Sequence, residues 1–87
     1  MNEHIVLGIH VTERVKQAQN IQQLFTDYGC NIKTRVGLHD ASHDACATGG
    51  LILLEMTGDA VKAHELHDHL AAIDGVYVQK MVFGHPK

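Results

Sequence analysis

Residues 49–83 decide the fold, and they read GGLILLEMTGDAVKAHELHDHLAAIDGVYVQKMVF. The run at 51–56 is apolar apart from one glutamate, which indicates a central strand whose two faces are both covered at least in part. Asp59 then suits the N-cap of a helix over residues 59–73, whose apolar residues recur three and four positions apart. Apolar and polar residues alternate from Val76 onward, so this stretch predicts a strand, a helix and a second strand.

The preceding half of the chain predicts the same kinds of element. Residues 4–11 carry five apolar residues without a helical period, which is typical of a strand. Thr12 is a candidate N-cap for a helix that ends near Tyr28, and Gly29 is expected in the left-handed conformation that often ends a helix. Over residues 31–38, Ile32, Thr34, Val36 and Leu38 alternate with Lys33, Arg35 and Gly37. This pattern predicts a strand whose lysine and arginine side chains lie on the solvent side.

These elements predict one domain over residues 1–87, of the α+β class. The order βαββαβ predicts a ferredoxin-like fold, a four-stranded antiparallel sheet with two helices on one face. The chain's own helices leave the opposite face of the sheet uncovered and partly apolar, which favours packing against a second copy. We therefore expect a homo-oligomer, either a dimer or a tetramer.

Composition excludes several classes of protein. The 87 residues carry a net charge of -3, so no basic surface for nucleic acid is expected. No apolar run approaches the roughly 20 residues that span a bilayer, and the first residues lack the features of a signal peptide. We therefore expect a cytoplasmic protein with no direct membrane or nucleic-acid contact. The sequence also lacks a nucleophile with a spaced base and a phosphate-binding glycine loop, so an enzyme is not expected.

Histidine is the unusual residue of this chain, which has eight copies of it. His39, His43 and Cys46 lie in the polar segment 39–50, which joins two predicted strands. Imidazole and thiolate groups together suit a transition metal such as nickel or zinc, so these three residues are the candidate metal ligands.

A second histidine cluster lies on the predicted helix, where His64, His67 and Asp68 share one exposed side. A closed four-coordinate metal site would need a fourth ligand from water, from one of these two histidines or from another subunit. The alternative interpretation is that the segment at 39–50 and the helix both present ordinary polar surface.

Four stretches carry a family resemblance: RVGL at 35–38, GGLILLEMTGD at 49–59, the spaced residues Leu66, Leu70 and Ile73, and DGVYVQKMVF at 74–83. They resemble the iron-only hydrogenase system regulators, whose fold is like the C-terminal domain of nickel-responsive regulators and like ACT domains. The resemblance implies a ferredoxin-like sensory domain that forms dimers or tetramers and has no established catalytic activity.

Two details of the resemblance bear on ligands. The stretch SHDAC at 42–46 is similar to the histidine-aspartate-x-cysteine stretch near the nickel site of the nickel-responsive regulators. Those regulators have a pair of histidines before the cysteine, whereas here His39 is followed by Asp40. ACT domains usually have a glycine-rich turn where this chain has VTE at 11–13, so an amino-acid site is not expected at that turn.

Two hypotheses for function follow. The first is a regulatory domain that senses a metal or a small molecule at or near a subunit interface, with His39, His43 and Cys46 as ligands. The second is a structural interaction module that pairs with a partner protein and binds no small ligand.

Overall fold

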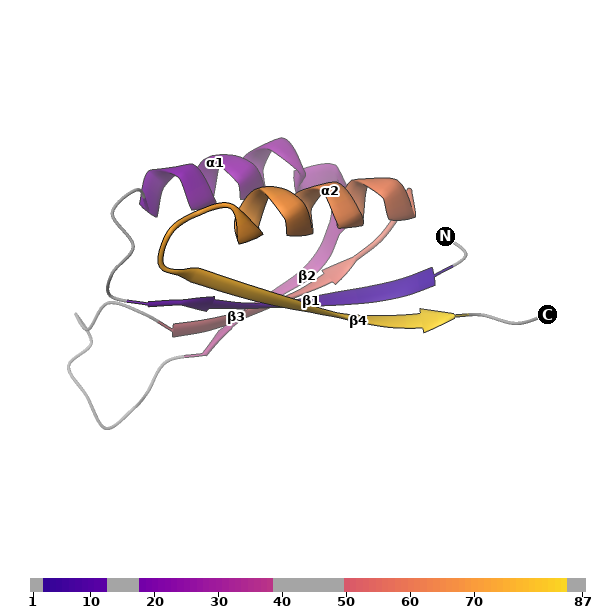
Figure 1. Cartoon of the computed structure of the whole chain (residues 1–87). Coiled ribbons are helices and arrows are strands. Elements are labelled where there is room, and N and C mark those ends of the chain that lie inside the picture. The colour runs from indigo at the N-terminus through magenta and orange to yellow at the C-terminus, as the bar shows by residue number, and fades with distance from the viewer. Residues whose placement is uncertain (1–2, 13–17, 39–49, 85–87) are drawn as a thin grey trace.

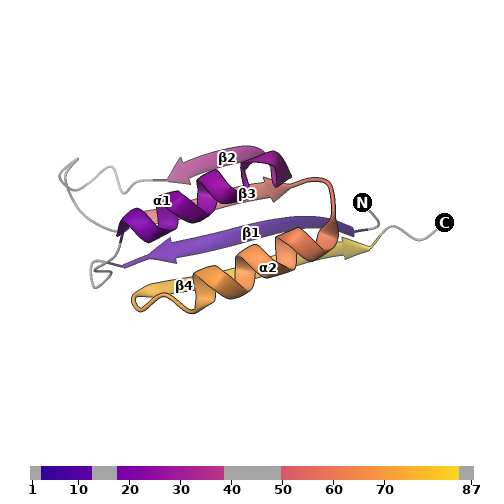
Figure 2. The same cartoon turned by 90° about the horizontal axis from the view of Figure 1, so that it is seen from above.

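The computed structural model describes residues 3–12, 18–38 and 50–84, and these form a sheet with two helices on one face (Figure 1). The elements are β1 Glu3–Val11, α1 Ala18–Asp27, a short 3-10 helix η1 Gly29–Asn31, β2 Ile32–Leu38, β3 Gly50–Met56, α2 Ala60–Ala71 and β4 Val76–Gly84. The sheet has the order β2-β3-β1-β4, and every neighbouring pair is antiparallel. The predicted ferredoxin-like fold is therefore confirmed. Seen from above, β2 and β4 form the two edges of the sheet (Figure 2).

The hydrophobic core lies between the sheet and the two helices. Alternate residues of β1 and β3 point toward the helices, because successive side chains of a strand lie on opposite faces. The helices contribute residues three and four positions apart, as their apolar periods predict. Among the described residues, those buried in this core are Ile5, Leu7, Ile9, Ile21, Phe25, Leu54, Met56, Ala63, Leu66, Leu70 and Val76.

The predicted orientation of β2 is wrong, and a β-bulge is the reason. The register with β3 shifts between Ile32 and Thr34. Beyond this shift, each residue of β2 therefore points to the face opposite to the one that the alternation predicts. Arg35 now lies opposite the buried Leu54, on the helix side, with its guanidinium carbon 4.7 Å from the centre of the Phe25 ring. Val36, which follows the bulge, therefore faces away from the helices.

The ends of the helices agree only partly with the sequence. Asp59 is the N-cap of α2, as predicted, and its carboxylate accepts a 2.9 Å hydrogen bond from the backbone N–H of Val61. Gly29 begins η1 and does not have a positive φ, so the predicted left-handed helix end is wrong. The described glycines with positive φ are Gly58 and Gly75, in the turns before and after α2.

The turn after α2 is tied to the end of β1. The backbone N–H and the hydroxyl of Thr12 donate hydrogen bonds of 2.9 Å and 2.7 Å to the carbonyl oxygen of Gly75. Residues 13–17 of the predicted first helix lie outside the described residues. No helix within the described ranges is long and apolar enough to cross a membrane.

Candidate functional site

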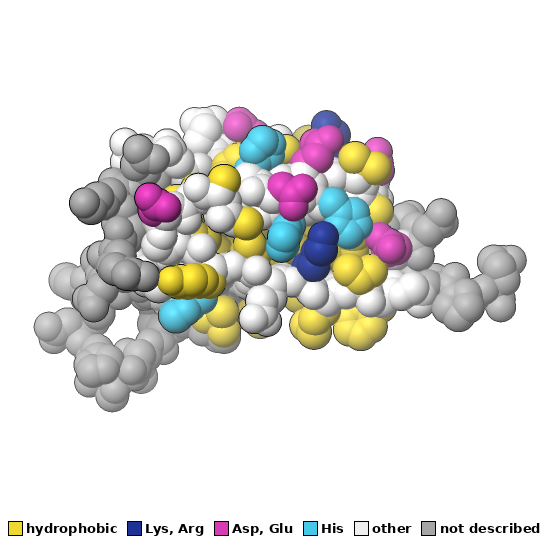
Figure 3. Space-filling model, in the orientation of Figure 1, with side chains coloured by type: hydrophobic (Ala, Val, Ile, Leu, Met, Phe, Trp, Pro, Cys, Tyr) yellow, Lys and Arg dark blue, Asp and Glu magenta, His cyan; other side chains and the backbone are white. Residues whose placement is uncertain are grey.

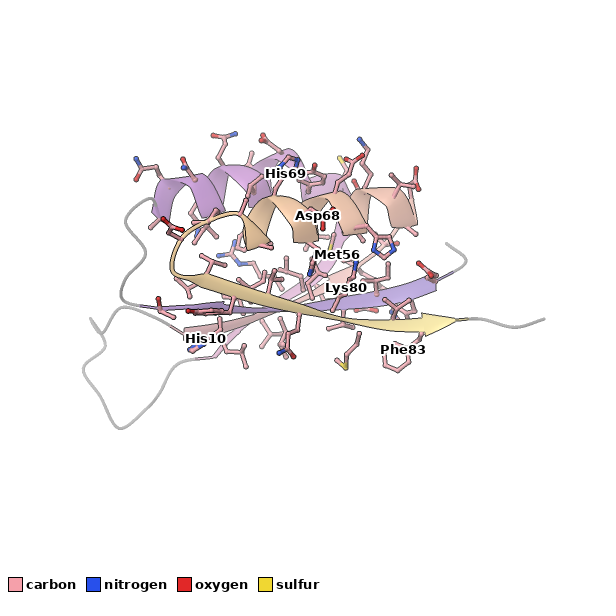
Figure 4. The ribbon with its side chains drawn as sticks, in the orientation of Figure 1. His10, Met56, Asp68, His69, Lys80 and Phe83 are labelled. Atoms are coloured by element: carbon pink, nitrogen blue, oxygen red, sulfur yellow. The ribbon has the colours of Figure 1, made fainter. Side chains whose placement is uncertain are left out.

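The side of the sheet that faces away from the helices is not covered by any element among the described residues (Figure 1). We call it the open face. The strand registers place thirteen residues on it: Thr34 and Val36 of β2, Leu51, Leu53 and Glu55 of β3, His4, Val6, Gly8 and His10 of β1, and Tyr77, Gln79, Met81 and Phe83 of β4. Figure 4 shows His10 and Phe83 pointing away from the helices.

Apolar side chains dominate the open face. Those most exposed are Val36 at 42%, Leu51 at 38%, Tyr77 at 55%, Met81 at 54% and Phe83 at 53%. Hydrophobic side chains are visible along the underside of the molecule, below the sheet (Figure 3). Exposed apolar residues scattered singly are ordinary, but here Val36 and Leu51 lie on adjacent strands, and Tyr77, Met81 and Phe83 follow one another on one face of β4. Such groups of apolar residues favour contact with another macromolecule.

One carboxylate lies on the open face, and it is hydrogen-bonded on both sides. Glu55 accepts a 2.9 Å hydrogen bond from Nε2 of His4 on β1 and another of 2.9 Å from the hydroxyl of Thr34 on β2. These bonds, first that of His4 and then that of Thr34, hold the pKa of Glu55 below its ordinary value. The charge therefore already has partners within the chain, which lowers the cost of covering this face.

The sequence did not reveal this row of three residues. His4 and Glu55 are 51 positions apart in the chain, and they meet only because β1 and β3 pair in the observed register. The pairing of β1 with β3 is enough to bring His4 close to Glu55. Thr34 joins them because the bulge in β2 turns its side chain to the open face.

Replacing Glu55 by Gln should make the chain less stable at neutral pH but not at low pH. Because the folded pKa of Glu55 lies below the unfolded one, its contribution is full above the ordinary carboxyl range and is lost as pH falls through the lowered value. Thermal melting of both proteins between neutral pH and about pH 3 measures this. The glutamine keeps the size of the side chain and an acceptor oxygen. A gap in melting temperature that stays constant with pH would contradict the prediction.

The predicted metal ligands His39, His43 and Cys46 lie outside the described residues. The strand ends on either side of them are described: Leu38 pairs with Leu51, and Leu51 pairs with His10 on its other side. Leu38 and Gly50, the described residues on either side of that segment, therefore both lie near the end of the sheet that holds His10.

His10 was not among the candidate ligands, although it is exposed and shares this end of the face with an aromatic residue. The centres of the His10 and Tyr77 rings are 6.4 Å apart. The signal that could have identified His10 was its position in the alternation of β1, which placed it with His4 on one face of the strand.

The histidines of α2 do not meet in a metal site. His64 lies 3.1 Å from Glu3 through Nε2 and 2.8 Å from Nζ of Lys80 through Nδ1. Since Lys80 can only donate, Nδ1 of His64 accepts and Nε2–H donates to Glu3. His67 contacts Asp68 at 2.9 Å and is the first cause that lowers the pKa of that carboxyl. Within the described ranges, no group of three or more His, Cys, Asp or Glu residues is placed to hold a metal ion.

Comparison with known proteins supports the fold. No protein-family model and no curated protein matches the sequence. The structure of the uncharacterized protein TM1266 from Thermotoga maritima is similar, with a TM-score of 0.75 and 23% identity over 92% of this chain and 96% of that one. The ACT domain from GTP pyrophosphokinase of Chlorobium tepidum has a TM-score of 0.62 and 18% identity over 90% of this chain and 96% of that one.

A third similar structure is a larger enzyme. The formyltetrahydrofolate deformylase from Pseudomonas putida KT2440 has a TM-score of 0.52 and 11% identity over 95% of this chain, but over 29% of its own. At these identities the three structures show the fold alone. The chain has a ferredoxin-like fold that is similar to the ACT domain.

Proposed function

We propose that the chain is a regulatory binding domain that works as a homo-oligomer, with the open face as the contact between copies. The observation that carries this proposal is a sheet face with exposed apolar side chains on β2, β3 and β4, whose carboxylate is already hydrogen-bonded to His4 and Thr34. Removing water from such a face costs little free energy, because burying the apolar side chains is favourable and the carboxylate keeps its hydrogen bonds.

The size of the open face is sufficient for a stable contact. Four strands spaced about 4.8 Å apart, with a rise of about 3.3 Å per residue, make a flat area of roughly 500 Å² for strands of this length. Two copies packed face to face would bury about twice that area before the relief of the side chains is counted. Specific protein contacts begin at about 1,000 Å² in total.

The ligand of the proposed regulator is a transition metal such as nickel or zinc, or a small molecule, bound beside the His10 end of the open face. His39, His43 and Cys46 are the proposed metal ligands, because the segment that carries them joins strand ends next to His10. Three ligands leave one position of a tetrahedral site for water or for a residue of another copy. If that residue comes from another copy, binding of the metal would favour assembly.

The finer assignment, to the iron-only hydrogenase system regulators, is supported by the stretches at 35–38, 49–59 and 74–83. The proposed domain has no catalytic activity and does not bind nucleic acid directly. A net charge of -3 is consistent with the lack of nucleic-acid binding. A partner protein that recognises the assembled form would complete the regulatory role.

Replacing Val36 by Glu tests the open-face contact. Val36 is 42% exposed in the single chain, so the new carboxylate is solvated in a monomer but would be buried without a partner in the face-to-face dimer. Burying an unpaired charge costs about 3 kcal/mol or more, so the dissociation constant should rise more than about 100-fold. Sedimentation velocity of the untagged protein over a range of concentrations measures the change.

A matched control is Val61→Glu, since Val61 is 57% exposed and lies on α2, on the other side of the sheet from the open face. The control should keep the mass of the wild type. A wild-type protein that is monomeric at high micromolar concentration, or a Val36→Glu variant that assembles as well as the wild type, would refute the open-face contact.

A further inference from the structure

The outer edge of β4 is a second surface suited to contact, separate from the open face. β4 pairs with β1 on one side, and the described residues place no strand on its other side (Figure 2). A strand edge presents a row of backbone N–H and C=O groups that can pair with another strand. The question is whether this edge is protected against pairing or open to it.

The hydrogen bond between Thr12 and Gly75 reveals which backbone groups of β4 point outward. The N–H of Thr12 donates to the carbonyl of Gly75, and these residues continue the register in which Val11 is opposite Val76. Hydrogen-bonded pairs alternate along an antiparallel ladder, so every second residue of β4 bonds to β1. Gln79, Met81 and Phe83 belong to this inward set. The backbone groups of the residues between them, Val78, Lys80 and Val82, point away from the sheet.

Three consecutive apolar residues near the end of β4 are exposed, and they lie on both faces of the sheet. Met81 and Phe83 are on the open face, at 54% and 53% exposure. Val82 is 42% exposed and lies opposite the buried Ile5, on the helix side. A partner that covers only the open face leaves Val82 in water. A partner strand alongside the edge contacts all three residues, because its own side chains also alternate between the faces.

The other edge of the sheet is built differently. β2 carries a register shift near Ile32, and such a bulge usually protects an edge strand, whereas the register of β4 has no shift. β2 also has two basic residues, Lys33 and Arg35, where β4 has Lys80 alone. Pairing of β4 with β2 of another copy would also bring these two basic residues toward Lys80. An open chain of copies joined β4 to β2 is therefore disfavoured, whereas contact of β4 with itself closes after two copies.

We propose that β4 pairs antiparallel with β4 of a second copy about a two-fold axis near Met81, which joins the two sheets into one of eight strands. In this register Lys80 lies opposite Val82 of the second copy, and the outward backbone groups of both strands meet. A register centred on Lys80 would place two ammonium groups opposite one another, which is unfavourable. The side chain of Lys80 is held on the helix side by His64, at 2.8 Å.

This edge contact does not depend on the proposed open-face contact or on a ligand. In the joined sheet both open faces lie on the same side, so the apolar residues of the two β4 strands lie next to one another on one face. If both contacts form, two joined sheets pack face to face into a closed tetramer. If only the edge contact forms, the assembly is a dimer.

Backbone amide exchange tests the proposal in the full chain. In an unpaired edge strand the amides of Met81 and Phe83, which bond to β1, exchange slowly, while those of Lys80 and Val82 exchange fast. In the proposed dimer all four should exchange slowly, with the protection of Lys80 and Val82 increasing at least tenfold as protein concentration rises and the dimer forms. NMR-detected hydrogen exchange at several concentrations resolves each amide.

Val82→Lys is the decisive variant, because it places a charge on the edge without touching the open face. It should restore fast exchange at Lys80 and at residue 82, and it should halve the mass of the largest assembly. Val61→Lys on α2 is the matched control and should behave as the wild type. Val36→Glu should leave the edge amides protected, which separates this contact from the open face.

Three results would overturn the edge contact. The first is an alternating exchange pattern along β4 in a wild-type protein that has assembled. The second is unchanged protection in Val82→Lys. The third is protection of Lys80 and Val82 that appears only when an extended peptide of another sequence is added, because β4 would then be an edge for a foreign strand.

Discussion

Leu66→Ala should cost about 2–5 kcal/mol of the free energy of unfolding, which is the usual range when a buried leucine is cut to alanine. Leu66 is 0% exposed and lies in the core between α2 and the sheet, so the loss includes both its transfer from water and the cavity left behind. The full stability of a chain of 87 residues is on the order of 4–13 kcal/mol. The variant should therefore lose a large share of its folded population. Urea unfolding followed by circular dichroism measures the change.

Val61→Ala is the control for this substitution, because it lies on the same helix and is 57% exposed. It should change stability by no more than about 0.5 kcal/mol. The dependence of unfolding free energy on urea should keep the same slope in all three proteins if the folded and unfolded states are otherwise alike. A Leu66→Ala variant as stable as the wild type would show that α2 does not pack on the sheet as described.

If His39, His43 and Cys46 hold a metal as proposed, Cys46→Ala should remove most of the affinity for it. A thiolate contributes a direct bond to nickel or zinc, and even the loss of a residue that only supports a ligand typically lowers affinity about 10- to 100-fold. Loss of the ligand itself should exceed that range. Calorimetric titration of nickel and of zinc into the untagged wild type and the variant gives the two affinities. Binding should also weaken as pH falls through the ordinary histidine range near about 6.5, because protons compete for the imidazoles.

His85→Ala is the control for the metal titration, since this histidine stands 39 positions after Cys46 and belongs to neither histidine cluster. It should bind metal as the wild type does. If the wild type binds no metal, or if Cys46→Ala binds equally well, the proposed ligands His39, His43 and Cys46 are wrong. The chain would then be better described as a structural interaction module. Its assembly through the open face would be tested by the Val36→Glu variant alone.

The sequence predicted the order of the elements because each carries its own periodic pattern. The alternation in β1 placed Ile5, Leu7 and Ile9 on one face, and the structure buries all three at 0% exposure. In α2 the cap and the apolar stripe agree with one another: Asp59 binds the first turn and Leu66 lies in the core. Local signals suffice here, because a helix or a strand with one apolar face has one favourable way to meet the core.

What the sequence could not predict depends on pairs of residues far apart in the chain. The bulge at Ile32 exists only in relation to β3, so the alternation of β2 suggested the wrong face for Arg35. Gly29 resembled a helix end, but the chain continues there into η1 without a positive φ. The row of His4, Thr34 and Glu55 joins three strands. The predicted metal ligands were chosen by residue type, and they lie outside the described residues.

The strands at the two ends of the described chain run side by side, with Glu3 opposite Gly84 (Figure 1). Tension applied to both ends would therefore load the ladder between β1 and β4 one pair at a time, beginning at Glu3 and Gly84. Peeling of this kind requires less force than sliding two strands past one another, in which many hydrogen bonds must break together. Each step would uncover another residue of the β1 core stripe, starting with Ile5. A molecule tethered at both ends would open as a zipper and present its interior from that end first.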